Sequence, residues 1–216
     1  MEEHGKSGVT FAIIVLVVLH YVGVIGFHLE DYRELFESLT PINLLISVGV
    51  LAYFHKIWNL NFGFWVFGVF WAGYLLEFVG VHTGLIFGDY SYGSTLGPKV
   101  AAVPPMMGLL WVMTAYMAGI LAQNMSTNLW LRVIMGALLM VILDFLIEPV
   151  AMEYDYWYWD AHRVPLTNYL TWFVVGAIMQ YVFHQIHQEK SNPVAYPLYL
   201  IQFGFFATFL IVDLAG

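Results

Sequence analysis

Two acidic side chains lie inside apolar stretches that are long enough to cross a membrane. Glu77 lies in the apolar run 62–80, and Asp144 lies in the apolar run 129–147. Ionisable groups at membrane depth are costly, so they usually face a protein interior and mark a functional site. Because a carboxyl group in apolar surroundings is hard to ionise, either residue could keep its proton and act as a general acid.

The two carboxyls are predicted to lie at the same depth. Glu77 follows Asn61 by sixteen residues, and Asp144 follows Asn128 by sixteen residues. With a rise of about 1.5 Å per residue, each lies roughly 24 Å along a helix that begins at a polar boundary. A hydrocarbon core is about 30 Å thick, so we expect both carboxyls in the far quarter of the membrane, facing each other across a central cavity.

Glu148 and His82 are the other candidates for acid–base chemistry. Glu148 follows Asp144 by four residues, which places both on one face of a helix. Pro149 disfavours helical geometry at Glu148, so we expect the helix to end or kink there, with Glu148 near the mouth of the cavity. His82 follows Glu77 by five residues and is expected at the same mouth. The predicted catalytic residues are therefore Glu77, Asp144, Glu148 and His82.

A purely structural role competes with each of these assignments. The acids could bind tyrosine or asparagine partners and lock helices together. A histidine at a helix end is more often a hydrogen-bonded structural group than a catalyst, and the same holds for His20 and His28 on the first helix.

Aromatic side chains near the acids could bind an apolar substrate. Their faces can stabilise a carbocation by about 2 kcal/mol per ring when water is excluded. Trp157 and Trp159 could instead belong to an interfacial aromatic belt. The predicted substrate-binding residues are Trp71, Tyr74, Phe78, Tyr90, Tyr92, Trp111, Trp157, Trp159, Asn168 and Trp172.

The middle of the chain resembles two copies of one unit. Copy one contains Leu76-Glu77-Phe78, Asp89-Tyr90-Ser91-Tyr92, Val103-Pro104 and Trp111. Copy two contains Leu143-Asp144-Phe145, Asp155-Tyr156-Trp157-Tyr158, Val164-Pro165 and Trp172. The copies are offset by two helices, which predicts parallel repeats related by an axis along the membrane normal. The glycine- and proline-rich stretch 83–104 is expected to form an ordered loop that folds back into the cavity mouth.

The composition sets the fold class. Of the 216 residues, 61% are hydrophobic and 10% are charged, whereas a soluble domain carries about 25% charged residues. We expect an all-α polytopic membrane protein, with residues 1–216 forming a single transmembrane domain. About seven transmembrane helices are predicted, at 9–27, 42–57, 62–80, 100–122, 129–147, 168–184 and 195–215. The first run lacks a basic n-region and a cleavage site and should stay as a helix.

The distribution of charge favours one face of the membrane as the working face. Only Glu2, Glu3 and Glu189 lie on the side of the N-terminus, and the remaining acids lie within or beyond the opposite half. The basic residues divide almost evenly and do not set the orientation. We expect a multi-pass protein of the cell (inner) membrane whose orientation and oligomeric state the sequence does not determine.

Several chemistries are excluded by missing motifs. The chain has no cysteine, and it has no phosphate-binding loop, no dinucleotide fingerprint and no set of histidine boxes for a di-iron centre. The last helix has no lysine for a retinal Schiff base. The remaining chemistry is acid–base catalysis on a lipid-soluble substrate, and we expect no cofactor, no metal and no nucleic-acid partner.

Over residues 62–175 the sequence resembles the membrane carotenoid hydratases. The residues that carry the resemblance are Glu77, Thr83-Gly84, Phe87-Gly88, Tyr90, Tyr92, Leu96-Gly97-Pro98, Val103-Pro104, Trp111, Asp144, Pro149, Trp157, Trp159, Pro165, Asn168 and Trp172. The resemblance implies addition of water to the terminal double bond of an acyclic, lycopene- or gamma-carotene-like end, which gives a tertiary alcohol. Its partners would be the carotenoid, water and membrane lipid.

Three alternatives remain open on the sequence. A lycopene-type cyclase would use the same protonation but let an internal double bond trap the cation. A proton-coupled transporter would use Glu77 and Asp144 as a relay. A non-catalytic carotenoid-binding protein would need neither carboxyl for chemistry.

Overall fold

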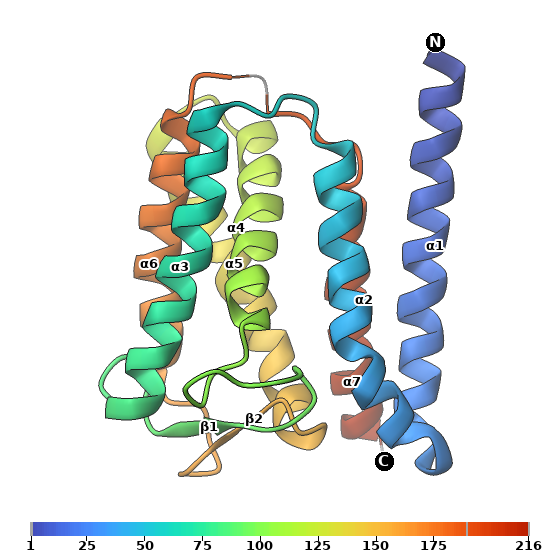
Figure 1. The fold of residues 1–216 in the computed structure, drawn as a ribbon, viewed down its shortest axis with the longest axis vertical. Helices are drawn as coiled ribbons and strands as arrows, with labels where there is room; N and C mark the ends of the chain where they lie inside the picture. The colour runs from blue at the N-terminus through green and yellow to red at the C-terminus, as the bar shows by residue number, and fades with distance from the viewer. Residues whose placement is uncertain (1, 189, 216) are drawn as a thin grey trace.

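Seven helices form the protein in the computed structural model, which describes residues 2–188 and 190–215. They are α1 (Glu2–His28), α2 (Arg33–Phe54), α3 (Leu60–Thr83), α4 (Met106–Met125), α5 (Leu129–Glu153), α6 (Leu166–Gln185) and α7 (Ala195–Ala215). Each is long and apolar enough to cross a membrane, which confirms an all-α polytopic membrane protein. The two ends of the chain lie at opposite ends of the bundle, as an odd number of spans requires (Figure 1).

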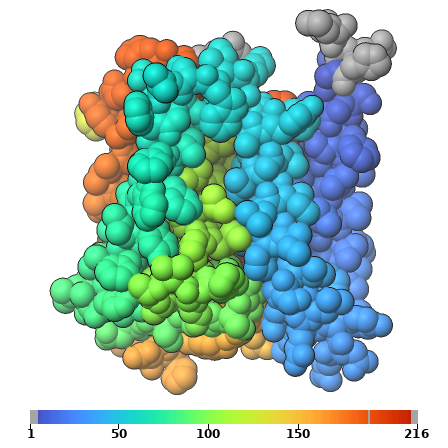
Figure 2. Space-filling view, in the orientation of Figure 1, coloured from blue at the N-terminus to red at the C-terminus, as the bar shows by residue number. Residues whose placement is uncertain are grey.

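The central element is α4, which packs against α2, α3, α5, α6 and α7. Most of its side chains are buried, including Trp111 and Tyr116. By contrast, α1 lies at the edge of the bundle and packs against α2 and α7. Figure 2 shows the face on which α4 is visible between α3 and α2. Because α4 is surrounded by other helices, apolar residues are expected around its whole circumference.

Two asparagines set the starting points of the helices that carry the acids. The side chain of Asn59 accepts a hydrogen bond from the first turn of α3, and the side chain of Asn128 does the same for α5. Asparagine is among the residues preferred at the N-cap of a helix. Counted in residues from these two caps, the depth of Glu77 along its helix lies between the depths of Asp144 and Glu148 along theirs. The predicted equal depth of Glu77 and Asp144, which used Asn61 as the starting point, is therefore only approximate.

Of the two outcomes predicted at Pro149, a helix end or a kink, the helix end is wrong. α5 continues to Glu153, and Glu148 lies inside the helix with 2% of its surface exposed. Pro149 removes one amide donor from the helix. The helical turn after it still forms, as the hydrogen bond from the Tyr154 amide to the Val150 carbonyl shows. Glu148 is therefore a buried residue of the bundle rather than a residue at its rim.

The two copies of the repeat meet in a short pair of strands at one end of the bundle (Figure 1). β1 (Tyr90–Tyr92) and β2 (Trp157–Trp159) pair antiparallel, with Ser91 opposite Tyr158 at the centre. A two-fold axis along the membrane normal between α3-β1-α4 and α5-β2-α6 would produce this symmetric register. Tyr90 therefore corresponds to Trp157, at the same sequence spacing as Glu77 to Asp144. The motif alignment from the sequence, which matched Tyr90 with Tyr156, is wrong by one residue.

The loops around the strands form an ordered layer over this end, as predicted for residues 83–104. Asp155 has a left-handed φ of 56°, and its carboxylate accepts hydrogen bonds from the Ser94 amide at 2.7 Å and the Ser94 hydroxyl at 2.5 Å. A Cβ at Gly93 would lie 2.1 Å from the Asp155 carbonyl oxygen, so only glycine permits this approach. The hydroxyls of Thr167 and Thr171 tie the layer to α6 by donating to Phe87 and Ile86.

Candidate active site

Glu77 accepts three hydrogen bonds from aromatic side chains. The Tyr90 hydroxyl donates to Oε2 at 2.5 Å, and the Tyr92 hydroxyl donates to the same oxygen at 2.7 Å. The indole of Trp111 donates to Oε1 at 2.9 Å. Residues 90 and 92 reach the same carboxyl because alternate side chains of a strand point to the same face. Glu77, with 3% of its surface exposed, is thus fully enclosed by donors.

Tyr90 and Tyr92 are held in the neutral form that such donation requires. Burial raises the pKa of each tyrosine well above its ordinary value, and the nearby Glu77 charge raises it further. Both hydroxyls therefore remain donors throughout the physiological pH range.

Glu148 occupies the corresponding position in the second copy. The indoles of Trp157 and Trp159 donate to its Oε2 at 3.0 Å and 2.7 Å, and the amide of Asn168 donates to its Oε1 at 3.0 Å. Indole N–H groups can only donate, so this arrangement satisfies an ionised carboxylate. The contacts of β2 thus correspond to those of β1, but they reach Glu148 rather than Asp144, which the repeat pairs with Glu77.

Asp144 lies one turn deeper than Glu148 and has a different environment. The Asn168 side chain donates to its Oδ2 at 2.8 Å, so one amide bridges both carboxyls. Within the described part of the chain, Oδ2 is the one carboxyl oxygen of Asp144 that has a hydrogen-bond partner. The residue is 4% exposed and lines a cavity of about 310 Å³.

This cavity is bounded by α1, α2, α4, α5 and α7, with β2 and α6 at one end. Most of its lining is apolar, which suits a hydrocarbon ligand. Besides Asp144, the lining includes Met107, Leu143, Ile147, Tyr156, Trp157 and Trp172. Glu77 lies outside the lining, so the expectation that both carboxyls face one chamber holds for Asp144 and fails for Glu77.

Trp111 and Trp172 lie between the Glu77 site and the cavity. Their rings are stacked, with centroids 3.7 Å apart and planes 8° apart. Trp111 donates to Glu77, whereas Trp172 lines the cavity. Gly73 makes room for this arrangement, because a Cβ there would lie 2.4 Å from the Trp111 ring. The indole stack thus separates Glu77 from the space that Asp144 faces.

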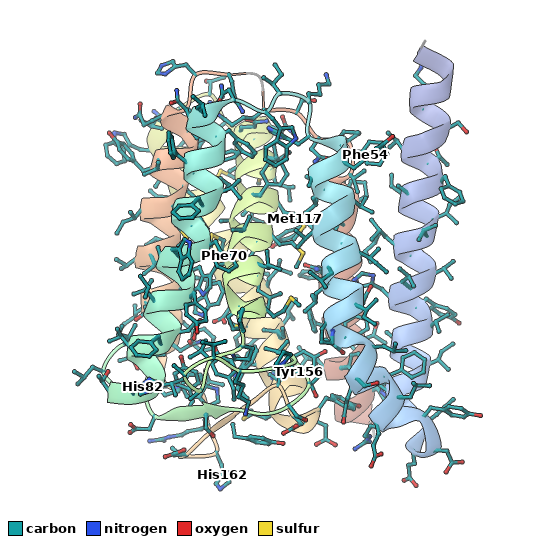
Figure 3. All side chains as sticks on the ribbon, in the orientation of Figure 1. Phe54, Phe70, His82, Met117, Tyr156 and His162 are labelled. Carbon is teal, nitrogen blue, oxygen red and sulfur yellow. The ribbon has the colours of Figure 1, made fainter. Side chains whose placement is uncertain are left out.

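Four predicted site residues lie elsewhere. Trp71 is 43% exposed on the outer surface of α3, and the Tyr74 hydroxyl donates to the Val100 carbonyl at 2.8 Å as a loop anchor. His82 is exposed, and its Nδ1 contacts the Phe78 carbonyl at 2.7 Å within its own helix. Phe78 packs against the His82 ring. In Figure 3 the labelled His82 lies at the outer edge of the bundle, away from Tyr156.

The other predicted residues are brought together. Tyr90, Tyr92 and Trp111 bind Glu77, while Trp157, Trp159 and Asn168 bind Glu148. Trp172 stacks on Trp111. The alternative that Trp157 and Trp159 form an interfacial belt is wrong, because both are buried and donate to a carboxyl.

Several polar residues of the cavity were not predicted from the sequence as site residues. Asn43, Thr114 and Gln202 line it together with His20. Each stands inside an apolar span, and a polar residue at membrane depth is the signal that could have identified it.

Comparison with known proteins identifies the family of the chain. Residues 39–215 match the carotenoid biosynthesis protein family. The chain belongs to this family. The resemblance predicted over 62–175 is therefore confirmed, and the matched region is longer. Family membership assigns the protein a role in carotenoid biosynthesis.

One relative of this chain is the bisanhydrobacterioruberin hydratase of Haloarcula japonica, which is 28% identical over 118 residues. The match covers 51% of this chain and 40% of the relative, so the chain spans well under two thirds of that protein's length. No solved structure is significantly similar to the chain.

Proposed function

We propose that this protein is a carotenoid 1,2-hydratase of the cell (inner) membrane. It adds water across the terminal C=C bond of an acyclic carotenoid end and forms a tertiary alcohol. The observation that carries this proposal is the position of Asp144, a carboxyl in the wall of an apolar cavity with one oxygen bound by Asn168. The hydratase name of the relative supports the same reaction class.

Asp144 is the general acid in this mechanism. Its carboxyl faces the cavity, and it delivers its proton to the less substituted carbon of the double bond. The tertiary cation then forms between Trp157 and Trp172, two cavity-lining indoles that attract positive charge. Water adds to the cation, loses a proton and gives the alcohol.

Glu148 and Glu77 act as positioning residues. Glu148 shares the Asn168 amide with Asp144, so it fixes the donor that orients the acid. Glu77 orients Trp111, whose ring supports the Trp172 face of the cavity. His82 has no part in this mechanism, because it lies on the exposed side of α3.

The polyene reaches the cavity from the lipid. Several lining residues on the α1–α2 side are also exposed on the outer surface, including Val22 at 45% and Ile42 at 53%. A rigid hydrocarbon chain can thus enter sideways, with its reacting end beside Asp144 and its remainder in the bilayer.

The deciding experiment is expression in a bacterium that makes lycopene, followed by mass analysis of the pigments. Hydration adds one water to the substrate mass, whereas cyclisation leaves the mass unchanged. A cyclic product with the mass of the substrate would show that the protein is a lycopene-type cyclase and not a hydratase. Unchanged carotenoids, together with solute movement driven by a pH gradient in liposomes, would favour a transporter. Unchanged carotenoids that remain bound to the protein would favour a binding protein.

A further inference from the structure

The cavity is lined by several polar side chains besides that of Asp144. α5 packs against α4, α6 and α7, whereas α2 packs against α1 and α4, so the cavity lies between α5 and α2. On the side of α1 and α2 it is lined by His20 of α1 and Asn43 of α2, and its lining also includes Gln202 of α7 and Thr114 of α4. These four side chains come from four helices and are uncharged donors and acceptors, apart from the titratable histidine.

Most of these polar groups have hydrogen-bonding capacity left over. The Oδ1 atom of Asn43 is buried and has no partner among the described residues. The Gln202 amide has a Met113 sulfur at 3.6 Å as its hydrogen-bond acceptor, a weak interaction. A buried polar group without a partner costs about 1–3 kcal/mol, so such groups usually hold an ordered water or a ligand.

The tautomer of His20 is set by its own helix. Its Nδ1 lies 2.8 Å from the Leu16 carbonyl oxygen, which can only accept, so Nδ1 carries the hydrogen. In the neutral ring, Nε2 is then the unprotonated nitrogen and can accept a proton. The ring is 6% exposed and packs edge-on against Phe205, which fixes its orientation at the cavity wall.

We infer that Asn43, His20 and Gln202 form a water-binding subsite that supplies the nucleophile of the hydration. This inference rests on the proposed function. Water held by Asn43 and His20 would lie on the α1–α2 side of the cavity, whereas Asp144 belongs to α5. A buried water needs two to four polar partners, and these side chains provide both donors and acceptors.

The step balances without a further reactant. Asp144 gives its proton to the less substituted carbon of the terminal C=C bond as the π bond breaks, which leaves a tertiary cation on the other carbon. The water oxygen forms a C–O bond to that cation, and one water proton passes to Nε2 of His20. Proton return from the imidazolium to the Asp144 carboxylate through solvent restores the starting state.

The test uses the full-length protein in membranes supplied with lycopene in deuterated water. Two quantities are measured: the hydrated product, and the deuterium in recovered substrate that reports reversible protonation by Asp144. For Asn43→Leu we expect hydrated product to fall about tenfold, because one hydrogen bond to the water is lost. For His20→Gln we expect a loss of about 100-fold, typical of a missing general base. Deuterium exchange should persist in both variants.

Asn61→Leu serves as the matched control, because Asn61 is an exposed asparagine on α3 outside this cavity. It should retain both hydration and exchange. A cyclic or rearranged product from Asn43→Leu would support the subsite, since the cation would form without being trapped. Unchanged hydration in both variants would overturn the subsite, and so would a joint loss of hydration and exchange, which would indicate a role in substrate binding or folding. A wild-type protein that neither hydrates nor exchanges would instead refute the proposed function itself.

Discussion

Trp111 and Trp172 lie face to face at 3.7 Å, one from each copy of the repeat. Their roles have diverged although their positions correspond. Trp111 donates to Glu77, whereas Trp172 lines the cavity one turn from Asn168, the residue that binds Asp144. One copy thus presents an enclosed carboxyl, and the other presents a carboxyl to a substrate-sized space.

Replacing the cavity carboxyl should remove catalysis and leave the fold intact. Asp144→Asn keeps an oxygen for the Asn168 amide but has no acidic proton. We expect product formation to fall by about 10²–10⁴, the usual contribution of a general acid. Pigment analysis in lycopene-producing cells measures the effect. Asp160→Asn, an exposed residue at the same end of the bundle, is the control and should retain activity. Full activity of Asp144→Asn would contradict the assigned acid.

Glu148→Gln should destabilise the protein. The carboxylate accepts three N–H groups, and an amide would direct its own N–H toward one of those donors. The cost of such an unsatisfied buried group is about 1–3 kcal/mol. Thermal unfolding in detergent measures it. Glu153→Gln, on the same helix, loses an exposed ion pair with Arg33 and should change stability by about 0–1 kcal/mol. Equal effects of the two substitutions would show that the indole contacts do not stabilise the fold.

Gly73→Ala should displace Trp111. The added Cβ would lie 2.4 Å from the ring, and Trp111 is fully buried, so the ring or the backbone must move. Overpacking of this kind costs about 1–3 kcal/mol, and the bond from Trp111 to Glu77 should weaken. The unfolding temperature and the tryptophan emission report the change.

Gly68→Ala is the control for that substitution. It lies in the same helix, and its Cβ would meet nothing within 4 Å. The better helix propensity of alanine should leave stability unchanged or raise it by up to about 1 kcal/mol. A Gly73→Ala variant as stable as Gly68→Ala would refute the close contact with Trp111.

The loop layer should be weakened by acid through Asp155. Burial alone would raise the pKa of Asp155, but hydrogen bonds from Ser94 and Tyr158 outweigh it and lower that pKa below the ordinary 3.8. The stabilisation is therefore present above the unfolded value of 3.8 and is lost as pH falls through the lower folded pKa.

Asp155→Asn tests this dependence, because asparagine tolerates the left-handed φ of 56° at this position. The variant should unfold at a lower temperature than the wild type near neutral pH, and the difference should shrink in strong acid. A difference that does not change with pH would mean that the Asp155 charge does not stabilise the loops.

Some site residues follow from local periodicity, and others do not. Asp144 and Glu148 are four residues apart and share a helix face, as the sequence indicates. His82 is five residues from Glu77, well over one turn at 3.6 residues per turn, so it points away from that carboxyl. The helical period alone could have excluded it.

The amino-acid sequence by itself determined the membrane class, the seven spans and the ordered loop layer, because hydropathy and glycine–proline content act over short stretches of chain. It also identified the acids and most of their aromatic partners by residue type. Only the tertiary structure decided which partner binds which acid: Trp157 and Trp159 hold Glu148, and Asp144 alone of the three acids faces the cavity. Those pairings depend on strand register and helix packing between distant segments, which no local pattern encodes.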